Sequence, residues 1–176
     1  MTQYASPDSD VSNVNWTDDA GGGSPIFDSI DDTQPTANDG DYIKSPVSPT
    51  SSDVVRFTLS NVIDPVSSTG HIIRFRHAKS AAAGKTIDIT VNLLQGGVQK
   101  ATTTVTSSGT TFTEWSYTLT GTEADSISNY NDLDFQVYAV QSGTGGNRDG
   151  RVSYLVFEVP DAPSGTIYSS SISIMW

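Results

Sequence analysis

From Tyr42 onward, apolar residues recur at every second position, and this period of two constrains the fold more than any other feature of the sequence. Successive side chains of a β-strand point to opposite faces of a sheet, so such alternation is typical of strands that bury one face. The clearest run places Ile87, Ile89, Val91 and Leu93 on one face. The chain is therefore predicted to be built mainly from strands.

Further strands follow from the same pattern, and two of them differ in their surroundings. The Thr-rich stretch Val98–Val105 is predicted to be an edge strand, because Thr has a high β propensity and tolerates a solvated face. The stretch Val152–Val159 is apolar on both faces, which indicates a central strand covered on both sides. The remaining strands are expected at residues 42–43, 54–59, 73–76, 115–119 and 133–139.

Glycines and one polar segment separate the strands. Ala83-Gly84, Gln95-Gly96-Gly97 and Asp149-Gly150 supply the positive φ angles that tight turns require, so they predict pairing of the strands they join. Residues 121–127 predict one short helix, capped by a Thr at 120 or 122. The fold class that follows is all-β: a two-sheet antiparallel β-sandwich, jelly-roll-like, with about four strands per sheet, one short helix and an extended N-terminal arm.

Charge is distributed unevenly along the chain. Residues 1–53 hold ten Asp and one Lys, which gives a charge of -9 out of the total of -11. This first third is also rich in Ser, Gly and Pro, a composition typical of an extended segment. Ile26, Phe27 and Ile30 are spaced like one face of a short helical turn, which would attach the segment to an apolar surface.

Three parts of the chain are expected: an acidic Ser/Gly/Asp-rich N-terminal arm packed on the core at 1–41, a β-sandwich domain at 42–160, and a C-terminal tail or added strand at 161–176. A strand gains main-chain hydrogen bonds at any open sheet edge, so the tail either completes its own sheet or pairs with a neighbouring subunit. The candidate interaction residues are Trp16 in the arm and Ile172, Ile174 and Trp176 in the tail.

Composition excludes several classes of partner. A net charge of -11 opposes binding to nucleic acid and to anionic membranes, because both attract basic surfaces. No stretch reaches the roughly 18 apolar residues of a membrane span, and the start of the chain lacks a secretion signal, so assembly in a cytoplasm is expected. The absence of Cys excludes disulfides, thiolate catalysis and Cys-based zinc sites.

No motif for catalysis is complete. The fragment Ala83-Gly84-Lys85-Thr86 lacks the earlier glycine of a phosphate-binding loop, because Lys79 occupies that position. There is no Gly-x-Ser-x-Gly elbow, and nothing selects a carboxylate pair for glycoside hydrolysis. His71 and His77 lie roughly 20 Å apart along one strand, too far for a shared metal. We therefore expect a protein that is not an enzyme.

Calcium is the one cofactor that the sequence leaves open, as a weak structural site. Hard cations bind several oxygen ligands, which closely spaced carboxylates supply, although the spacing here is not that of an EF-hand loop. The candidate pairs are Asp8 and Asp10, Asp31 and Asp32, and Asp39 and Asp41.

The run Asp64–Arg76, followed by Ile87–Val91 and Leu94–Gly97, resembles a group of β-sandwich domains found in structural proteins of tailed bacteriophages. The similarity extends to further segments: Pro7–Val11, Trp16-Thr17, Asp41–Ile43, Trp115–Leu119 and Glu123–Ile127. The resemblance implies no catalytic residues. It implies turn positions at Gly70, Gly96 and Gly97 and core positions at Trp115 and Phe135.

The resemblance favours a capsid decoration or cement protein, because the chain consists of one such domain with an arm and a tail. This protein would bind and stabilise the head shell of the virion, with the major capsid protein or other virion proteins as partners, and would form a homo-oligomer. The alternative is a tail or fibre accessory that binds a host-receptor carbohydrate on exposed aromatic side chains. The candidate aromatics are Trp16, Tyr138, Tyr168 and Trp176.

Overall fold

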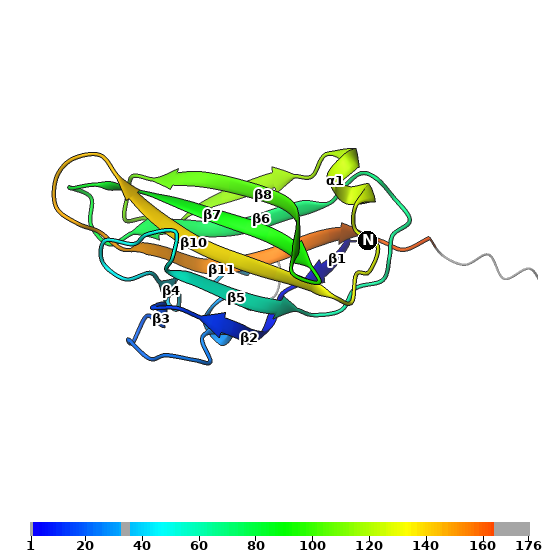
Figure 1. Cartoon of the computed structure of the whole chain (residues 1–176), viewed down its shortest axis with the longest axis horizontal. Coiled ribbons are helices and arrows are strands. Elements are labelled where there is room, and N and C mark those ends of the chain that lie inside the picture. Colours follow the sequence, from blue (N-terminus) through cyan, green and yellow to red (C-terminus); the bar gives the residue numbers. More distant parts are fainter. Residues whose placement is uncertain (1, 33–35, 164–176) are drawn as a thin grey trace, which may run out of the picture.

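In a computed structural model, the chain folds into two antiparallel β-sheets that pack face to face (Figure 1), and the structure describes residues 2–32 and 36–163. The strands are β1 Thr2–Ala5, β2 Pro7–Asn13, β3 Thr17–Asp18, β4 Ile43–Lys44, β5 Val54–Leu59, β6 Ile72–Lys79, β7 Thr86–Gln95, β8 Val98–Ser107, β9 Thr113–Thr118, β10 Leu133–Ser142 and β11 Gly150–Pro160. One sheet has the order β3-β4-β11-β6-β9, with β1 also paired to β11, and the other has the order β2-β5-β10-β7-β8. The predicted all-β sandwich is confirmed, with six and five strands in place of about four each.

The core lies between the two inner faces, and alternation along the strands builds it. β10 pairs with β7 from Leu133 opposite Gln95 to Ser142 opposite Thr86, so their apolar positions share one face. The largest apolar side chains without exposed surface come from both sheets: Phe57, Phe75, Phe135 and Phe157. Phe135 is thus a core residue, as the phage resemblance implies.

The predicted edge and central strands are confirmed. β8 is the last strand of its sheet, whereas β11 has β6 on one side and β4 and β1 on the other. All residues from Val152 to Phe157 are buried, because the polypeptide covers both faces of β11.

The turn predictions are correct at one place and wrong at two. β7 and β8 form a hairpin through Gly96 and Gly97, whose φ angles are 56° and 80°. Ala83-Gly84 and Asp149-Gly150 do not join paired strands, because β6 and β7 lie in different sheets, as do β10 and β11. Gly84 has the predicted positive φ, at 93°, whereas Gly150 does not, and a positive φ reverses the chain locally without determining which sheet receives the next strand.

The predicted helix is confirmed as α1, Gly121–Asp125, and it begins with a capping box. The hydroxyl of Thr120 accepts a hydrogen bond from the Glu123 N–H at 3.3 Å, and the Glu123 carboxylate accepts one from the Thr120 N–H at 2.8 Å. These two bonds satisfy N–H groups that the short helix itself leaves unpaired.

The acidic N-terminal third is part of the sandwich. β1 pairs with β11 and β2 pairs with β5, so the sandwich begins at β1 and not at residue 42. The 3-10 turn η1, Phe27–Ser29, is flanked by the buried residues Ile26 and Ile30, as their spacing predicts. The backbone N–H of Leu155 in β11 donates to the Ile30 carbonyl at 3.2 Å, which attaches this segment to the central strand.

Among the described residues, no helix has the length and apolar character needed to cross a membrane. The predicted interaction residues Ile172, Ile174 and Trp176 lie outside the described residues.

Candidate functional site

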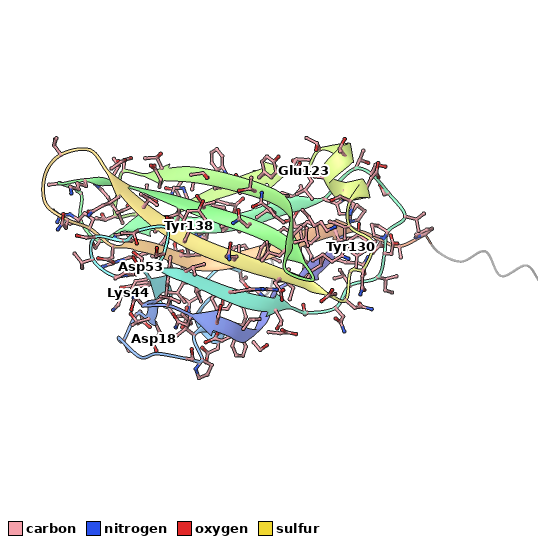
Figure 2. The ribbon with its side chains drawn as sticks, in the orientation of Figure 1. Asp18, Lys44, Asp53, Glu123, Tyr130 and Tyr138 are labelled. Atoms are coloured by element: carbon pink, nitrogen blue, oxygen red, sulfur yellow. The ribbon has the colours of Figure 1, made fainter. Side chains whose placement is uncertain are left out.

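Within residues 2–32 and 36–163, the two sheets leave one side of the sandwich open, between the edge strands β8 and β9. β2 and β3 are the edge strands on the opposite side, so the N-terminal segment lies away from this opening (Figure 1). Residues 108–112 connect β8 to β9 at one end of the opening. At the other end lies α1, where Figure 2 labels Glu123.

Trp115 stands at this opening. In the pairing of β9 with β6, Trp115 is opposite the buried Phe75, so the indole points toward the space between the sheets. Its Nε1–H donates to the Thr103 hydroxyl of β8 at 2.9 Å, a bond that joins the edges of the two sheets. The side chain is nevertheless 38% exposed, because no further strand among the described residues covers β9.

A second bond between the sheets lies deeper in the opening. His77 of β6 and Ser107 of β8 are both buried, and Nδ1 of His77 lies 2.5 Å from the Ser107 hydroxyl. Burial lowers the pKa of the His77 imidazole, because it penalises the charged form. His77 is therefore held as a neutral group that exchanges one hydrogen bond with the hydroxyl of Ser107.

These residues line a cleft of about 400 Å³, which is within the range of small-molecule sites. Its lining is rich in small polar residues and comprises His77, Val105, Thr106, Ser107, Ser108, Gly109, Thr111, Thr113, Glu114 and Trp115. The one carboxylate of this lining, Glu114, accepts a hydrogen bond from Arg74 at 2.7 Å. Arg74 also pairs with Glu158 at 2.8 Å, and the two carboxylates raise the pKa of its guanidinium.

Trp115 is not the core residue that the phage resemblance implies. Its parity along β9 agrees with a core position, but β9 is an edge strand, so the inward direction leads to the opening and not to a covered interior. Sequence reasoning placed Trp115 in the core and missed it as a candidate binding residue. The Thr-rich pattern of the other edge strand, β8, is the signal that could have indicated this opening.

Trp16 is not available as an interaction residue, contrary to the prediction. It is 1% exposed and belongs to the core, and its Nε1–H donates to the Asp53 carbonyl at 2.8 Å. The chain on both sides of Trp16 pairs into the sheets, which carries the ring inward.

Of the other aromatic candidates, Tyr138 is the one that the structure describes, since Tyr168 and Trp176 lie outside the described residues. Tyr138 is half-buried on the outer face of β10, opposite Val54 of β5 and Thr90 of β7. Figure 2 labels it on the sheet that faces the viewer, and Tyr138 is not among the described residues that line the Trp115 cleft.

The proposed calcium ligands are largely engaged in other contacts. The carboxylate of Asp10 accepts hydrogen bonds from the backbone N–H groups of Ile26 and Phe27, and Asp39 pairs with Arg76. No group of three or more His, Asp or Glu side chains in the described part of the chain could hold a metal ion. His71 and His77 make separate contacts, because His71 Nε2 lies 2.7 Å from the Tyr130 hydroxyl.

No protein-family model matches the chain, and no curated protein matches it. Among solved structures, the chain is similar to a carbohydrate-binding module, CBM36, whose structure holds calcium and xylotriose. The two sequences are 16% identical, the match covers 90% of this chain and 97% of that chain, and the TM-score is 0.43. It is similar to a family 35 carbohydrate binding module from Clostridium thermocellum, with 16% identity, 92% and 99% covered, and a TM-score of 0.42.

A third similar structure is the enzymatically active domain of bacteriophage CBA120 tailspike protein 4, with 13% identity, 89% of this chain and 19% of that chain covered, and a TM-score of 0.40. These likenesses are distant and concern the sandwich architecture. The function must therefore be argued from the residues of this chain.

Proposed function

We propose that this protein is a non-catalytic carbohydrate-binding module and that the cleft at Trp115 holds the glycan. The observation that carries the proposal is a half-exposed indole beside a cleft of about 400 Å³ lined mainly by small polar residues. A sugar ring presents C–H groups that pack on an aromatic face and hydroxyls that exchange hydrogen bonds with Ser, Thr and main-chain groups.

The cleft is suited to binding and not to cleavage. Glycoside hydrolysis uses two carboxyl groups on either side of the scissile bond. The described lining of the cleft holds one, Glu114, which is already paired with Arg74. The buried His77 is bonded to Ser107 and lacks the buried carboxylate partner of a catalytic triad among its hydrogen bonds in the described residues.

The indole is also held rigidly before any ligand arrives. The bond from Trp115 Nε1 to Thr103 fixes the ring between the edges of β8 and β9. A rigid ring loses little conformational entropy when a sugar packs on it, so this bond contributes to affinity without touching the ligand.

The test is retention of the purified protein in native gels that contain soluble polysaccharides, with xylan and host-surface polysaccharide in the panel. The wild type is expected to be retarded by at least one of them, and Trp115→Ala is expected to lose the retardation. Trp115→Phe keeps an aromatic face but not the bond to Thr103, so it should bind more weakly and remain folded.

Tyr138→Ala is the matched control, because it removes another aromatic side chain on a different face. Unchanged retardation by a folded Trp115→Ala protein would refute the cleft as the glycan site. Loss of retardation in Tyr138→Ala alone would place the glycan on the outer face of the β2-β5-β10-β7-β8 sheet.

Capsid decoration is the second proposal, and it rests on the phage resemblance together with one surface feature. Ile63 and Val66 are 67% and 78% exposed in the loop before β6. The side chain of Gln3 donates both to the Ile63 carbonyl and to the Pro160 carbonyl, so this loop lies next to the end of β11. Co-sedimentation with undecorated capsids tests this proposal, and Ile63→Ser should weaken the association if the loop contacts the shell.

A further inference from the structure

A second cavity, of about 410 Å³, lies where β1 leads into β2 and η1 packs beside them. β2 and β8 are opposite edges of one sheet, so this cavity is on the other side of the sandwich from the Trp115 cleft. The cavity belongs to the acidic N-terminal third of the chain, except for Ser60, which follows β5.

Two aromatic rings and two carboxylates line this cavity. Tyr4 of β1 is 44% exposed and Phe27 of η1 is half-buried, so the rings form part of the accessible wall. Asp8 lies on β2 and Asp31 follows η1. No Lys, Arg or His is among the described residues that line the cavity. It is therefore an acidic site with an aromatic wall.

Asp31 lies among other carboxyl groups. The pKa of the Asp31 carboxyl is raised, first by burial and then by repulsion from Asp32, Asp28 and Asp41. These surroundings therefore disfavour the ionised form of the Asp31 carboxyl. A bound cation would reverse the effect and favour the ionised form.

The chemistry of the wall distinguishes between kinds of cation. A calcium ion requires about six to eight oxygen ligands, and the described residues contain no group of three or more acids that could hold a metal. An ammonium group attached to an apolar body uses both parts of this site, because aromatic faces attract the cation and carboxylates accept its N–H groups.

We propose that the cavity formed by Tyr4, Phe27, Asp8 and Asp31 binds a protonated amine carried on a body the size of a sugar ring or an amino-acid side chain. The proposal does not depend on glycan binding at Trp115, because the two sites share no residue. An amino sugar and a lysine side chain are two sources of the same ammonium chemistry.

The test is a titration of the uniformly ¹⁵N-labelled full chain, followed by amide chemical shifts. The probes are glucosamine, its uncharged analogue N-acetylglucosamine, Nα-acetyl-lysine amide and calcium chloride. At neutral pH, at least one amine is expected to shift the amides of Tyr4, Asp8, Phe27 and Asp31. N-acetylglucosamine is expected to bind at least about tenfold more weakly than glucosamine, because acetylation removes the charge. The tighter of the two amines identifies the source.

Three variants test the residues. Asp31→Asn keeps the shape of the side chain and removes its charge, and Tyr4→Leu keeps an apolar side chain and removes the π face. Each should weaken amine binding by about tenfold. Asp88→Asn is the matched control, because Asp88 lies on β7 and accepts a hydrogen bond from Thr106, away from this cavity. Its affinity for the amines should equal that of the wild type, as should the affinity of Trp115→Ala.

Several results would overturn the proposal. Equal binding of glucosamine and N-acetylglucosamine would show that the charge has no role. Displacement of the amine by millimolar calcium at the same amides would make the cavity a metal site. No shift at these amides with either amine at millimolar concentration, in a folded sample, would exclude an ammonium site.

Discussion

Replacement of Trp16 tests whether the N-terminal segment is an integral part of the core. Trp16 is fully buried, and removal of a buried large aromatic side chain costs about 3 to 5 kcal/mol in other proteins. Trp16→Ala also removes the donor to the Asp53 carbonyl, and an unpaired buried acceptor adds about 1 kcal/mol. Trp16→Ala is therefore expected to lower the free energy of unfolding by about 5 kcal/mol, a large part of the roughly 5 to 15 kcal/mol of a typical domain.

Urea denaturation followed by far-UV circular dichroism measures this loss without relying on tryptophan fluorescence. Trp16→Phe keeps most of the apolar volume and loses the hydrogen bond, so its loss should be clearly smaller than that of Trp16→Ala. Trp115→Ala is the control, since that side chain is half-exposed and should cost less than Trp16→Ala. A loss below about 1 kcal/mol for Trp16→Ala would refute the reasoning, because only surface residues are normally so tolerant.

Three other predictions follow from the fold. Burial lowers the pKa of both His71 and His77 below 6.5, so the unfolded chain binds more protons than the folded chain around and below that pH. The free energy of unfolding should be nearly constant well above pH 6.5 and should fall as the pH is lowered through this value. Urea titrations that show no decline would contradict this. Gly97→Ala should lower the free energy of unfolding by about 1 kcal/mol, because Gly97 has a φ of +80° that a residue with a Cβ rarely adopts. Gly109→Ala is the control: no atom lies within 4 Å of the added Cβ, so the loss in the same denaturation experiment should be smaller. Deletion of residues 166–176 should leave the far-UV spectrum and the melting temperature unchanged, but it should weaken the association of the protein with capsids or with other copies of the chain. If sedimentation shows that the shortened chain associates as well as the full chain, the tail has no role in assembly.

Local sequence determined most of the elements from Tyr42 onward, but not the strands β1, β2 and β3 of the N-terminal segment. Alternation at Ile87–Leu93 identifies β7 because the pleat of a strand places every second side chain on one face. Thr120 and Glu123 identify the start of α1, and Gly96 and Gly97 identify the β7–β8 hairpin, because capping and positive φ angles depend on neighbouring residues alone.

Tertiary structure decided how these elements are placed, and with it the candidate sites. The sequence predicted that Trp16 is available for contacts and that Trp115 is in the core, and the structure shows the reverse. The cavity at Tyr4 likewise requires β1, β2 and η1 to meet, which no local pattern indicates. A period of two shows which face of a strand is apolar, but the exposure of a side chain depends on what covers that face. The rest of the fold decides that cover: Trp16 is buried in the core, where its indole donates to the carbonyl of the distant Asp53, whereas no further strand lies beside Trp115 among the described residues.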